Sequence, residues 1–116
     1  MKLILLLVFS YGIYHFYVGS DDDVDSGVSA RELEPRCDVI LFTTASCPYC
    51  KKARNLLITK RAKWCEKDIN ISTENHKLFK SLGGRGVPLA LIGSEVIKGY
   101  RESNYIAALE QIEVMY

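Results

Sequence analysis

Two patterns of apolar residues alternate along the chain from about residue 38 onward. Short apolar runs are typical of buried strands, whereas apolar residues spaced three or four apart are typical of amphipathic helices. In chain order these patterns predict a strand over 38–43, a helix over 48–61, a strand over 63–70, a helix over about 73–82, the two strands of a hairpin over 88–92 and 95–98, and a helix over 103–113. This β-α-β-α-β-β-α order predicts one domain of the α/β class.

The first 36 residues do not share these patterns. Leu3 to Gly19 is an apolar run behind Lys2, which is typical of a secretory signal peptide or a short membrane anchor. From Ser20 to Arg36 the chain has few large apolar residues and many acidic ones, a composition typical of flexible segments. We therefore expect a signal anchor or signal peptide over 1–19, a flexible acidic linker over 20–36, and the folded domain over 37–116.

The charges beside the apolar run predict its orientation. Lys2 lies before the run, whereas Asp21, Asp22 and Asp23 follow it. The positive-inside rule then keeps the N-terminus in the cytoplasm and places the folded domain on the extracytoplasmic side, either exported or anchored through residues 3–19. Small residues at Val18-Gly19-Ser20 suit signal cleavage, so a cleaved signal and a retained single-pass anchor both stay open.

The distribution of charge excludes one class of partner. The formal net charge of +1 combines three basic and six acidic residues in 1–36 with twelve basic and eight acidic residues in 37–116. The surplus in the folded domain, twelve minus eight or four positive charges, is too small to indicate a nucleic-acid partner. It mildly favours an acidic small thiol or an acidic protein.

The chemistry of the domain is concentrated in Cys47-Pro48-Tyr49-Cys50, where the first predicted strand leads into the first predicted helix. A cysteine at a helix N-terminus has its thiolate stabilised by unpaired backbone N–H groups and by the helix dipole. Cys47 is therefore expected to be the attacking thiol, and Cys50 to resolve the mixed disulfide. Zinc sites also use this spacing but normally need a second close pair, which Cys37 and Cys65 do not supply, so no bound metal is expected.

The chain resembles the glutaredoxin branch of the thioredoxin-like superfamily over about residues 38–113. The resemblance rests on the run from Thr43 to Cys50, on Gly86-Val87-Pro88 before the third predicted strand, and on Gly99-Tyr100 after the fourth. It implies a thioredoxin-like fold with a central mixed four-stranded sheet, and thiol–disulfide oxidoreductase activity. It also implies that Pro88 is a cis proline beside Cys47 and that the backbone of Val87 pairs with substrate.

The resemblance further implies the remaining site residues and the partners. Tyr49, Gly99 and Tyr100 would border the substrate site together with Val87 and Pro88. The substrates would be protein disulfides or glutathione mixed disulfides, with glutathione as the thiol co-substrate and no bound cofactor. The protein is expected to be a monomer.

One departure from the family pattern concerns the electron donor. Many glutaredoxins carry a lysine three residues before the first motif cysteine, where it meets a glutathione carboxylate, and this chain has Thr44. Two alternatives stay open. One is a redoxin reduced by an enzyme of the thioredoxin reductase type, and the other is a non-enzymatic carrier of a metal or an iron–sulfur cluster. The proline and tyrosine inside the motif disfavour the carrier.

The other two cysteines, Cys37 and Cys65, begin strands that are predicted to be parallel neighbours. They are expected to be small residues of the core or the sheet edge. A structural disulfide between them stays open, because such a bond requires Cα atoms within about 7 Å of each other.

Overall fold

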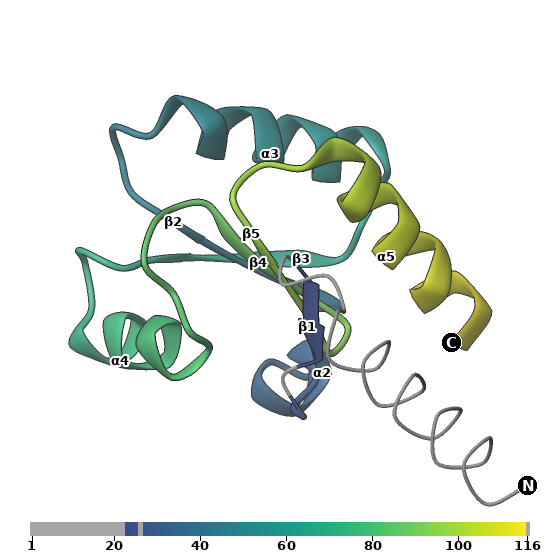
Figure 1. The fold of residues 1–116 in the computed structure, drawn as a ribbon, viewed down its shortest axis with the longest axis horizontal. Coiled ribbons are helices and arrows are strands. Elements are labelled where there is room, and N and C mark those ends of the chain that lie inside the picture. The colour runs from purple at the N-terminus through teal and green to yellow at the C-terminus, as the bar shows by residue number, and fades with distance from the viewer. Residues whose placement is uncertain (1–22, 26, 116) are drawn as a thin grey trace, which may run out of the picture.

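The computed structural model describes residues 23–25 and 27–115, in which short strands and helices alternate (Figure 1). The strands are β1 (Asp23–Asp25), β2 (Val39–Thr43), β3 (Trp64–Asp68), β4 (Leu89–Ile92) and β5 (Glu95–Lys98). The helices are α2 (Ala30–Leu33), α3 (Pro48–Thr59), α4 (Thr73–Ser81) and α5 (Glu102–Met115). From β2 onward the order is the predicted one, and each element begins and ends within two residues of the prediction.

The strands form one mixed sheet in the order β1-β5-β4-β2-β3. β2 and β3 are parallel, whereas β2 with β4, β4 with β5, and β5 with β1 are antiparallel. The four strands from β2 to β5 are the predicted four-stranded sheet, and β1 adds a fifth strand at its edge. Phe42 near the end of β2 lies opposite Leu89 at the start of β4, so the segments around Cys47 and Pro88 begin at the same end of the sheet.

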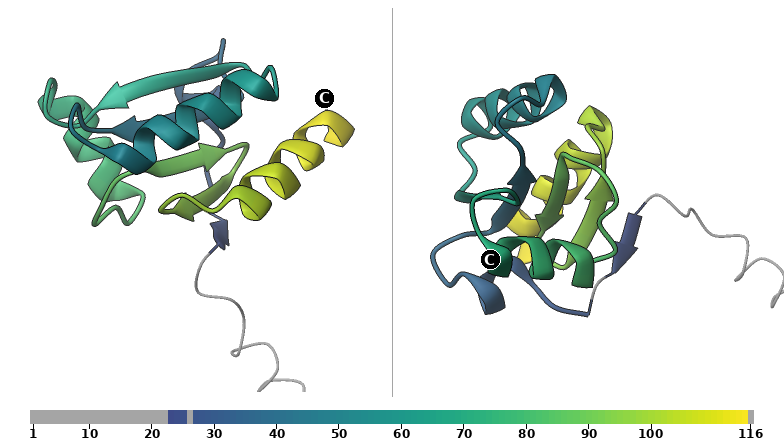
Figure 2. Two further views of the ribbon diagram at one scale, coloured as in Figure 1. Left: turned by 90° about the horizontal axis from the view of Figure 1, so that it is seen from above. Right: turned by 90° about the vertical axis from the view of Figure 1, so that its left-hand side faces the viewer.

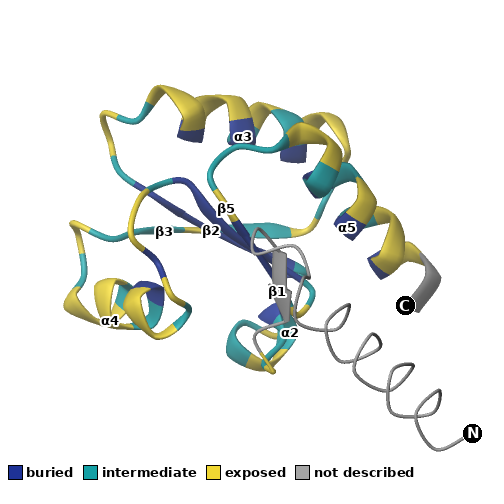
Figure 3. Ribbon diagram, viewed as in Figure 1, coloured by how far each residue is buried: buried dark blue, intermediate teal, exposed yellow. Residues whose placement is uncertain are grey.

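Helices cover both faces of the sheet and bury its strands between two layers (Figures 2 and 3). α3 and α5 lie on one face, where the core consists of Val39, Leu41, Ala90, Ile92 and Ile97 from the sheet with Ala53, Leu57, Tyr105, Ala108 and Ile112 from the helices. α2 and α4 lie on the other, where the core consists of Ile40, Phe42, Leu89, Leu91 and Val96 with Ala30 and Phe79. Because both faces are covered, β2 and β4 read as continuous apolar runs.

The ends of the helices are set by local hydrogen bonds. Ser72 caps α4 by accepting the N–H of Asn75 at 3.3 Å. α3 ends in a turn in which the N–H of Arg61 bonds the Ile58 carbonyl and the next N–H bonds the Leu57 carbonyl, both at 3.0 Å. Arg61 adopts φ 55° in this turn, where glycine is usual, and the turn sends the chain back into β3 alongside β2.

The described part of the segment before β2 is folded onto the domain, which differs from the flexible linker expected over 20–36. β1 pairs with the outer edge of β5 through backbone groups. Ala30 in α2 is fully buried and donates its N–H to the Gly93 carbonyl at 2.7 Å. Composition does not reveal either contact, because an edge strand uses backbone hydrogen bonds and α2 buries a residue as small as alanine.

No helix among the described residues is long and apolar enough to cross a membrane. The apolar run from Leu3 to Gly19 lies outside the described residues. The signal peptide or membrane anchor expected there therefore stays a prediction.

Candidate active site

Cys47 occupies the position immediately before α3 and caps the helix with its own side chain. Its backbone is extended, with φ −94° and ψ 111°, and its Sγ accepts the N–H of Cys50 at 3.1 Å. Pro48 follows in the first turn, where its missing N–H costs no helical hydrogen bond. Cys47 is half-buried, so its sulfur is open to solvent on one side and lies at the N-terminal end of the helix on the other. This is the environment expected for an attacking thiolate.

Cys50 lies one turn further along α3 and is fully buried. Burial, followed by a hydrogen bond with Cys47, raises the pKa of Cys50 from 9.0 to about 12. A hydrogen bond from the Thr44 backbone and the positive charge of Arg54 oppose this rise in pKa. The two cysteines are therefore inequivalent, with an accessible thiol in front and a buried, protonated thiol behind it.

The chain before β4 forms the wall beside Cys47. The Val87–Pro88 peptide bond is cis, and the thiol of Cys47 lies 3.7 Å from the Val87 carbonyl oxygen as a hydrogen-bond donor. The Pro88 carbonyl accepts the N–H of Gly99 at 2.9 Å, which holds the Gly99-Tyr100 segment against the same loop. Val87 and Pro88 are thus brought to Cys47 as predicted by the resemblance, and Gly99 is joined to them through the backbone.

Two aromatic residues predicted for the site lie in different settings. Tyr49 is 58% exposed, and the ammonium group of Lys52 lies 5.1 Å from the centre of its ring. Tyr100 is half-buried and packs edge-on against Tyr105, with ring centres 5.7 Å apart. Tyr49 is therefore free to contact a bound molecule beside Cys47, whereas Tyr100 belongs to a packed aromatic pair.

Tyr105 of α5 supports the Gly99 segment, a contact that the sequence does not predict. Its ring is fully buried, and its hydroxyl donates to the Gly99 carbonyl at 3.2 Å. Burial, and then the negative charges of the Cys50 and Tyr100 side chains, raise the pKa of Tyr105. A buried tyrosine normally needs a partner for its hydroxyl, so its presence in an apolar stripe was the available signal.

A second missed feature is a chain of polar side chains beside the cysteines. Arg54 of α3 donates to both carboxylate oxygens of Glu66 on β3, at 2.7 and 2.8 Å. Glu66 also accepts the hydroxyl of Thr43, the last residue of β2, at 2.8 Å. The hydrogen bond from Arg54, before any other cause, lowers the pKa of Glu66. The spacing of four between Cys50 and Arg54 is visible in the sequence, but the pairing with Glu66 is not.

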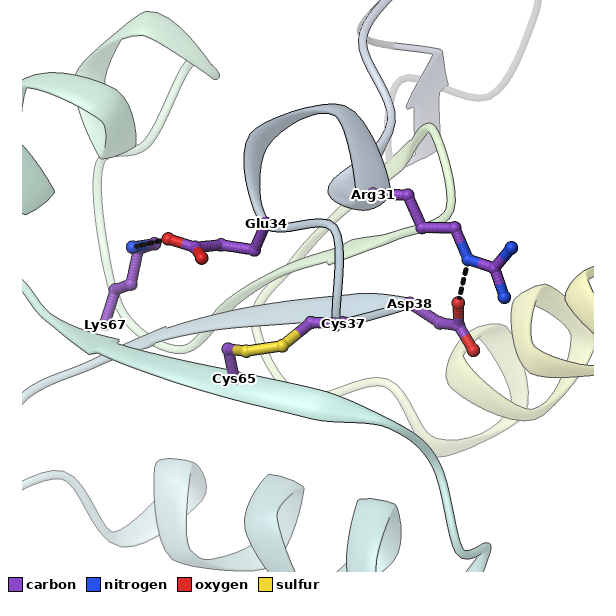
Figure 4. The surroundings of a disulfide bond; sticks show 6 residues. All are labelled: Arg31, Glu34, Cys37, Asp38, Cys65 and Lys67. Atoms are coloured by element: carbon purple, nitrogen blue, oxygen red, sulfur yellow. Dashed lines mark hydrogen bonds and ion pairs between the residues drawn. A yellow bond between two sulfur atoms is a disulfide. The ribbon is translucent and has the colours of Figure 1, made fainter.

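Cys37 and Cys65 form a disulfide on the face of the sheet that α2 and α4 cover (Figure 4). Their Cα atoms are 5.9 Å apart, within the range that the bond requires. On one side of the disulfide, Lys67 and Glu34 form an ion pair, with Nζ 2.7 Å from Oε1. The alternative that the sequence left open is therefore the one found, and this cysteine pair is separate from Cys47 and Cys50.

The family model for glutaredoxin matches residues 39–97, just over half of the chain. The chain belongs to the glutaredoxin family. Among curated proteins, glutaredoxin 1 of Rickettsia prowazekii (strain Madrid E) is 38% identical to this glutaredoxin over 64 residues, which cover 53% of this chain and 67% of the relative.

Solved structures place this glutaredoxin in the thioredoxin-like fold. A glutaredoxin from Archaeoglobus fulgidus matches with a TM-score of 0.58 and 19% identity, over 72% of this chain and 97% of that one. A buckwheat glutaredoxin in complex with glutathione matches with a TM-score of 0.54 and 20% identity, over 71% of this chain and 84% of that one. The predicted fold class is thus confirmed for β2 to α5. Within residues 23–25 and 27–115, no three His, Cys, Asp or Glu side chains converge as metal ligands.

Proposed function

We propose that this glutaredoxin catalyses thiol–disulfide exchange through Cys47 and Cys50. The observation that carries the proposal is the half-buried Cys47 sulfur at the start of α3, which accepts the N–H of a fully buried Cys50. A thiolate at such a position is stabilised by the helix end, and a second thiol directly behind it is placed to close the bridge. Sequence, fold and family all support this assignment.

The reaction has two displacement steps. In the first, the thiolate of Cys47 attacks a substrate disulfide, a new bond forms between Cys47 and one substrate sulfur, and the other substrate sulfur leaves as a thiolate that takes up a proton. In the second, Cys50 loses its proton and attacks the Cys47 sulfur. The Cys47–Cys50 disulfide forms as the remaining substrate sulfur leaves and is protonated, so two substrate thiols replace one substrate disulfide.

We propose protein disulfides and glutathione mixed disulfides as the substrates, bound along Val87 and Pro88 with Tyr49, Gly99 and Tyr100 at the border. The Val87 segment precedes a strand and lies beside Cys47, so its backbone is available to pair with an extended peptide. The related buckwheat glutaredoxin was solved with glutathione, which supports glutathione as the thiol co-substrate here.

Replacement of each cysteine tests this function. Cys47→Ser should abolish every exchange activity, because no attacking thiolate remains. Cys50→Ser should keep the removal of glutathione from mixed disulfides, which needs one thiol, and should lose the reduction of protein disulfides. Steady-state rates with a glutathionylated peptide and with a disulfide protein measure the two activities. Equal losses in both variants with both substrates would contradict the assigned roles.

Thr44 favours a second candidate for the electron donor. In many relatives a lysine at this position contacts a carboxylate of glutathione. Thr44 carries no charge and cannot make that contact. A redoxin reduced by an enzyme of the thioredoxin reductase type would not need that cation. Comparing the rates at which glutathione and an NADPH-dependent thioredoxin reductase reduce the Cys47–Cys50 disulfide separates these donors, because the physiological one should be faster at matched concentration.

We also propose that the domain acts outside the cytoplasm, anchored or exported through residues 1–19. Lys2, the apolar run behind it and the acidic residues that follow support this orientation. The Cys37–Cys65 disulfide supports it further, because structural disulfides persist in oxidising compartments. A reporter that is active only outside the cytoplasm, fused after Tyr116, should be active and should sediment with membranes if the anchor is retained. A silent reporter in the soluble cytoplasmic fraction would contradict the proposal.

A further inference from the structure

Arg54 lies on the same side of α3 as the buried cysteine, four residues after Cys50. Its guanidinium group is held by a two-pronged contact to Glu66, with Nε 2.7 Å from one carboxylate oxygen and Nη2 2.8 Å from the other. Thr43 donates to the second of these oxygens at 2.8 Å. β2, β3 and α3 therefore each contribute one side chain to a single hydrogen-bonded chain.

This arrangement holds the guanidinium of Arg54, on the helical turn after Cys50, in an ion pair with Glu66. Two parallel N–H···O contacts between a guanidinium group and a carboxylate restrict both the position and the orientation of the guanidinium group. The ammonium group of a lysine would not be restricted in this way. Thr43 is fully buried, and the side chains of Arg54 and Glu66 are only 27% and 33% exposed. Burial raises the pKa of Cys50, and the positive charge of Arg54 lowers it in part. The pKa of Arg54 is raised first by its hydrogen bond to Glu66 and also by the charge of Cys50.

The second step of the exchange is the one that needs such a charge. Cys50 must lose its proton before it can attack the Cys47 sulfur, although burial holds it in the protonated form. The other titratable groups near Cys50 are Cys47 on its own helix, Tyr105 from α5 and, from β3, the Glu66 carboxylate that is bonded to Arg54. None of these three carries a positive charge, so Arg54 is the cation that acts on Cys50. Cys47 is moreover bonded to substrate sulfur at that stage and carries no negative charge.

We propose that Arg54 is a positioning residue for the resolving step, in which the charge held by Glu66 and Thr43 stabilises the thiolate of Cys50 as it attacks the mixed disulfide. This inference rests on the proposed exchange through Cys47 and Cys50. It assigns to Arg54 a role that begins only after the first displacement, because the attack by Cys47 on substrate does not require the proton of Cys50 to leave.

A chromogenic disulfide separates the two steps within one experiment. The reduced full-length protein in detergent solution is mixed with an excess of 4,4′-dithiodipyridine, which is uncharged and releases an absorbing thiopyridone at each displacement. Attack by Cys47 releases the first equivalent, and attack by Cys50 on the resulting mixed disulfide releases the second. Wild-type protein should show two phases. Release of only one equivalent by the wild type would instead contradict the proposed dithiol function itself.

Arg54→Gln should slow the second phase about three- to tenfold near neutral pH and leave the first phase unchanged. Loss of the charge raises the pKa of Cys50 and reduces its thiolate fraction, an effect partly offset because a more basic thiolate is more nucleophilic. The rate of the second phase should rise with pH in both proteins, with the profile of Arg54→Gln displaced to higher pH. Arg54→Lys keeps the charge and should restore part of the rate.

Arg31→Gln is the matched control, because Arg31 also donates to a carboxylate, that of Asp38, but at the opposite end of β2. Both phases should keep wild-type rates in this variant. Arg54→Met, which keeps most of the aliphatic stem, replaces Arg54→Gln if the latter does not fold. An unchanged second phase in the neutral variants, or equal slowing of both phases, would overturn the proposed role of Arg54.

Discussion

At the scale of single residues, the two motif cysteines differ in chemistry although only Pro48 and Tyr49 separate them. Cys47 lies half-buried at the helix end, where its Sγ accepts the backbone N–H of Cys50. Cys50 lies fully buried one turn later, where the neutral thiol is favoured and its pKa rises to about 12. The two thiols thus differ in exposure, as the proposed exchange requires.

The raised pKa of Cys50 predicts how the stability of the reduced protein depends on pH. In the unfolded chain this thiol loses its proton near pH 9.0, whereas in the folded protein it keeps the proton until about pH 12. Between these values the unfolded state binds fewer protons, so the free energy of unfolding decreases as the pH rises from about 9 toward 12. Urea unfolding of the reduced protein should therefore show a lower midpoint at pH 10 than at pH 8.

Lysine and tyrosine side chains also titrate above pH 9, so the contribution of Cys50 must be separated from theirs. Cys50→Ala is the control for this purpose. The variant should lose the part of the pH dependence that Cys50 contributes, and its midpoint should fall less between pH 8 and pH 10. Identical pH dependence in the two proteins would contradict the assignment of a protonated, buried Cys50.

Positions that depend on near neighbours in sequence were predictable from the pattern, whereas most contacts with distant partners were not. The placement of Cys47 and Cys50 at the start of α3 followed from the predicted helix start and their spacing of three. Tyr105 and Arg54 were missed, because their partners Gly99 and Glu66 come from other elements. A periodic pattern records which side of a helix is apolar, but it does not record where a hydroxyl or guanidinium finds its acceptor.

At the scale of elements, α4 is fixed to the sheet through one aromatic contact. Phe79 is 2% exposed and lies against Phe42 of β2, with ring centres 5.9 Å apart. Gly84, just beyond the helix, donates its N–H to the Phe79 carbonyl at 2.9 Å, so the chain turns back directly over the ring. A Cβ atom at Gly84 would lie 2.5 Å from the ring of Phe79. The absence of a side chain here allows α4 to dock and the chain to reach Pro88.

Gly84→Ala should therefore destabilise the protein by about 1–3 kcal/mol, because the ring of Phe79 must move out of a packed core. Gly86→Ala is the matched control, since no atom lies within 4 Å of a Cβ built there, and its effect should stay within about 0.5 kcal/mol. Urea unfolding of the two variants and the wild type compares them. Equal stability of Gly84→Ala and Gly86→Ala would show that the Phe79 contact adapts without cost.

The elements that the sequence predicted are those with a clear apolar run or a clear apolar period. The apolar runs of β2 and β4 and the stripes of α3 and α5 reflect burial between two helical layers, so pattern and structure agree. β1 and α2 were not predicted. β1 is a three-residue edge strand and α2 is a four-residue helix, both too short to show a period, and they are held by backbone pairing and by the single buried Ala30.

At the scale of the whole molecule, the Cys37–Cys65 disulfide connects the segment before the domain to the far edge of its sheet. Cys65 lies on β3 opposite Ile40, on the face that α2 covers, and Cys37 follows α2 directly. The ion pair from Lys67 to Glu34 joins the same two regions (Figure 4). The turn from Glu34 to Cys37 and the pairing of β2 with β3 bring the two cysteines together. The sequence does not show this turn, so it left the bond open.

The bond closes a loop with a sequence separation of 28 that contains β2, the Cys47–Cys50 motif and α3. A cross-link over a loop of this size restricts the unfolded chain and contributes about 3–4 kcal/mol to stability in the chain-entropy account. In a Cys47→Ser/Cys50→Ser background, where this is the one remaining pair, further replacement of Cys37 and Cys65 by alanine should lower the free energy of unfolding by about that amount.

Two measurements distinguish a lost cross-link from a merely poorer core. Dithiothreitol should lower the urea midpoint of the background protein and leave that of the alanine variant unchanged, because only the former has a bond to reduce. Amide hydrogen exchange in α2 should be faster in the alanine variant, since the bond holds the end of that helix to β3. If reductant shifts both midpoints equally, or if thiol titration of the unreduced background protein finds Cys37 and Cys65 free, the disulfide does not stabilise this glutaredoxin.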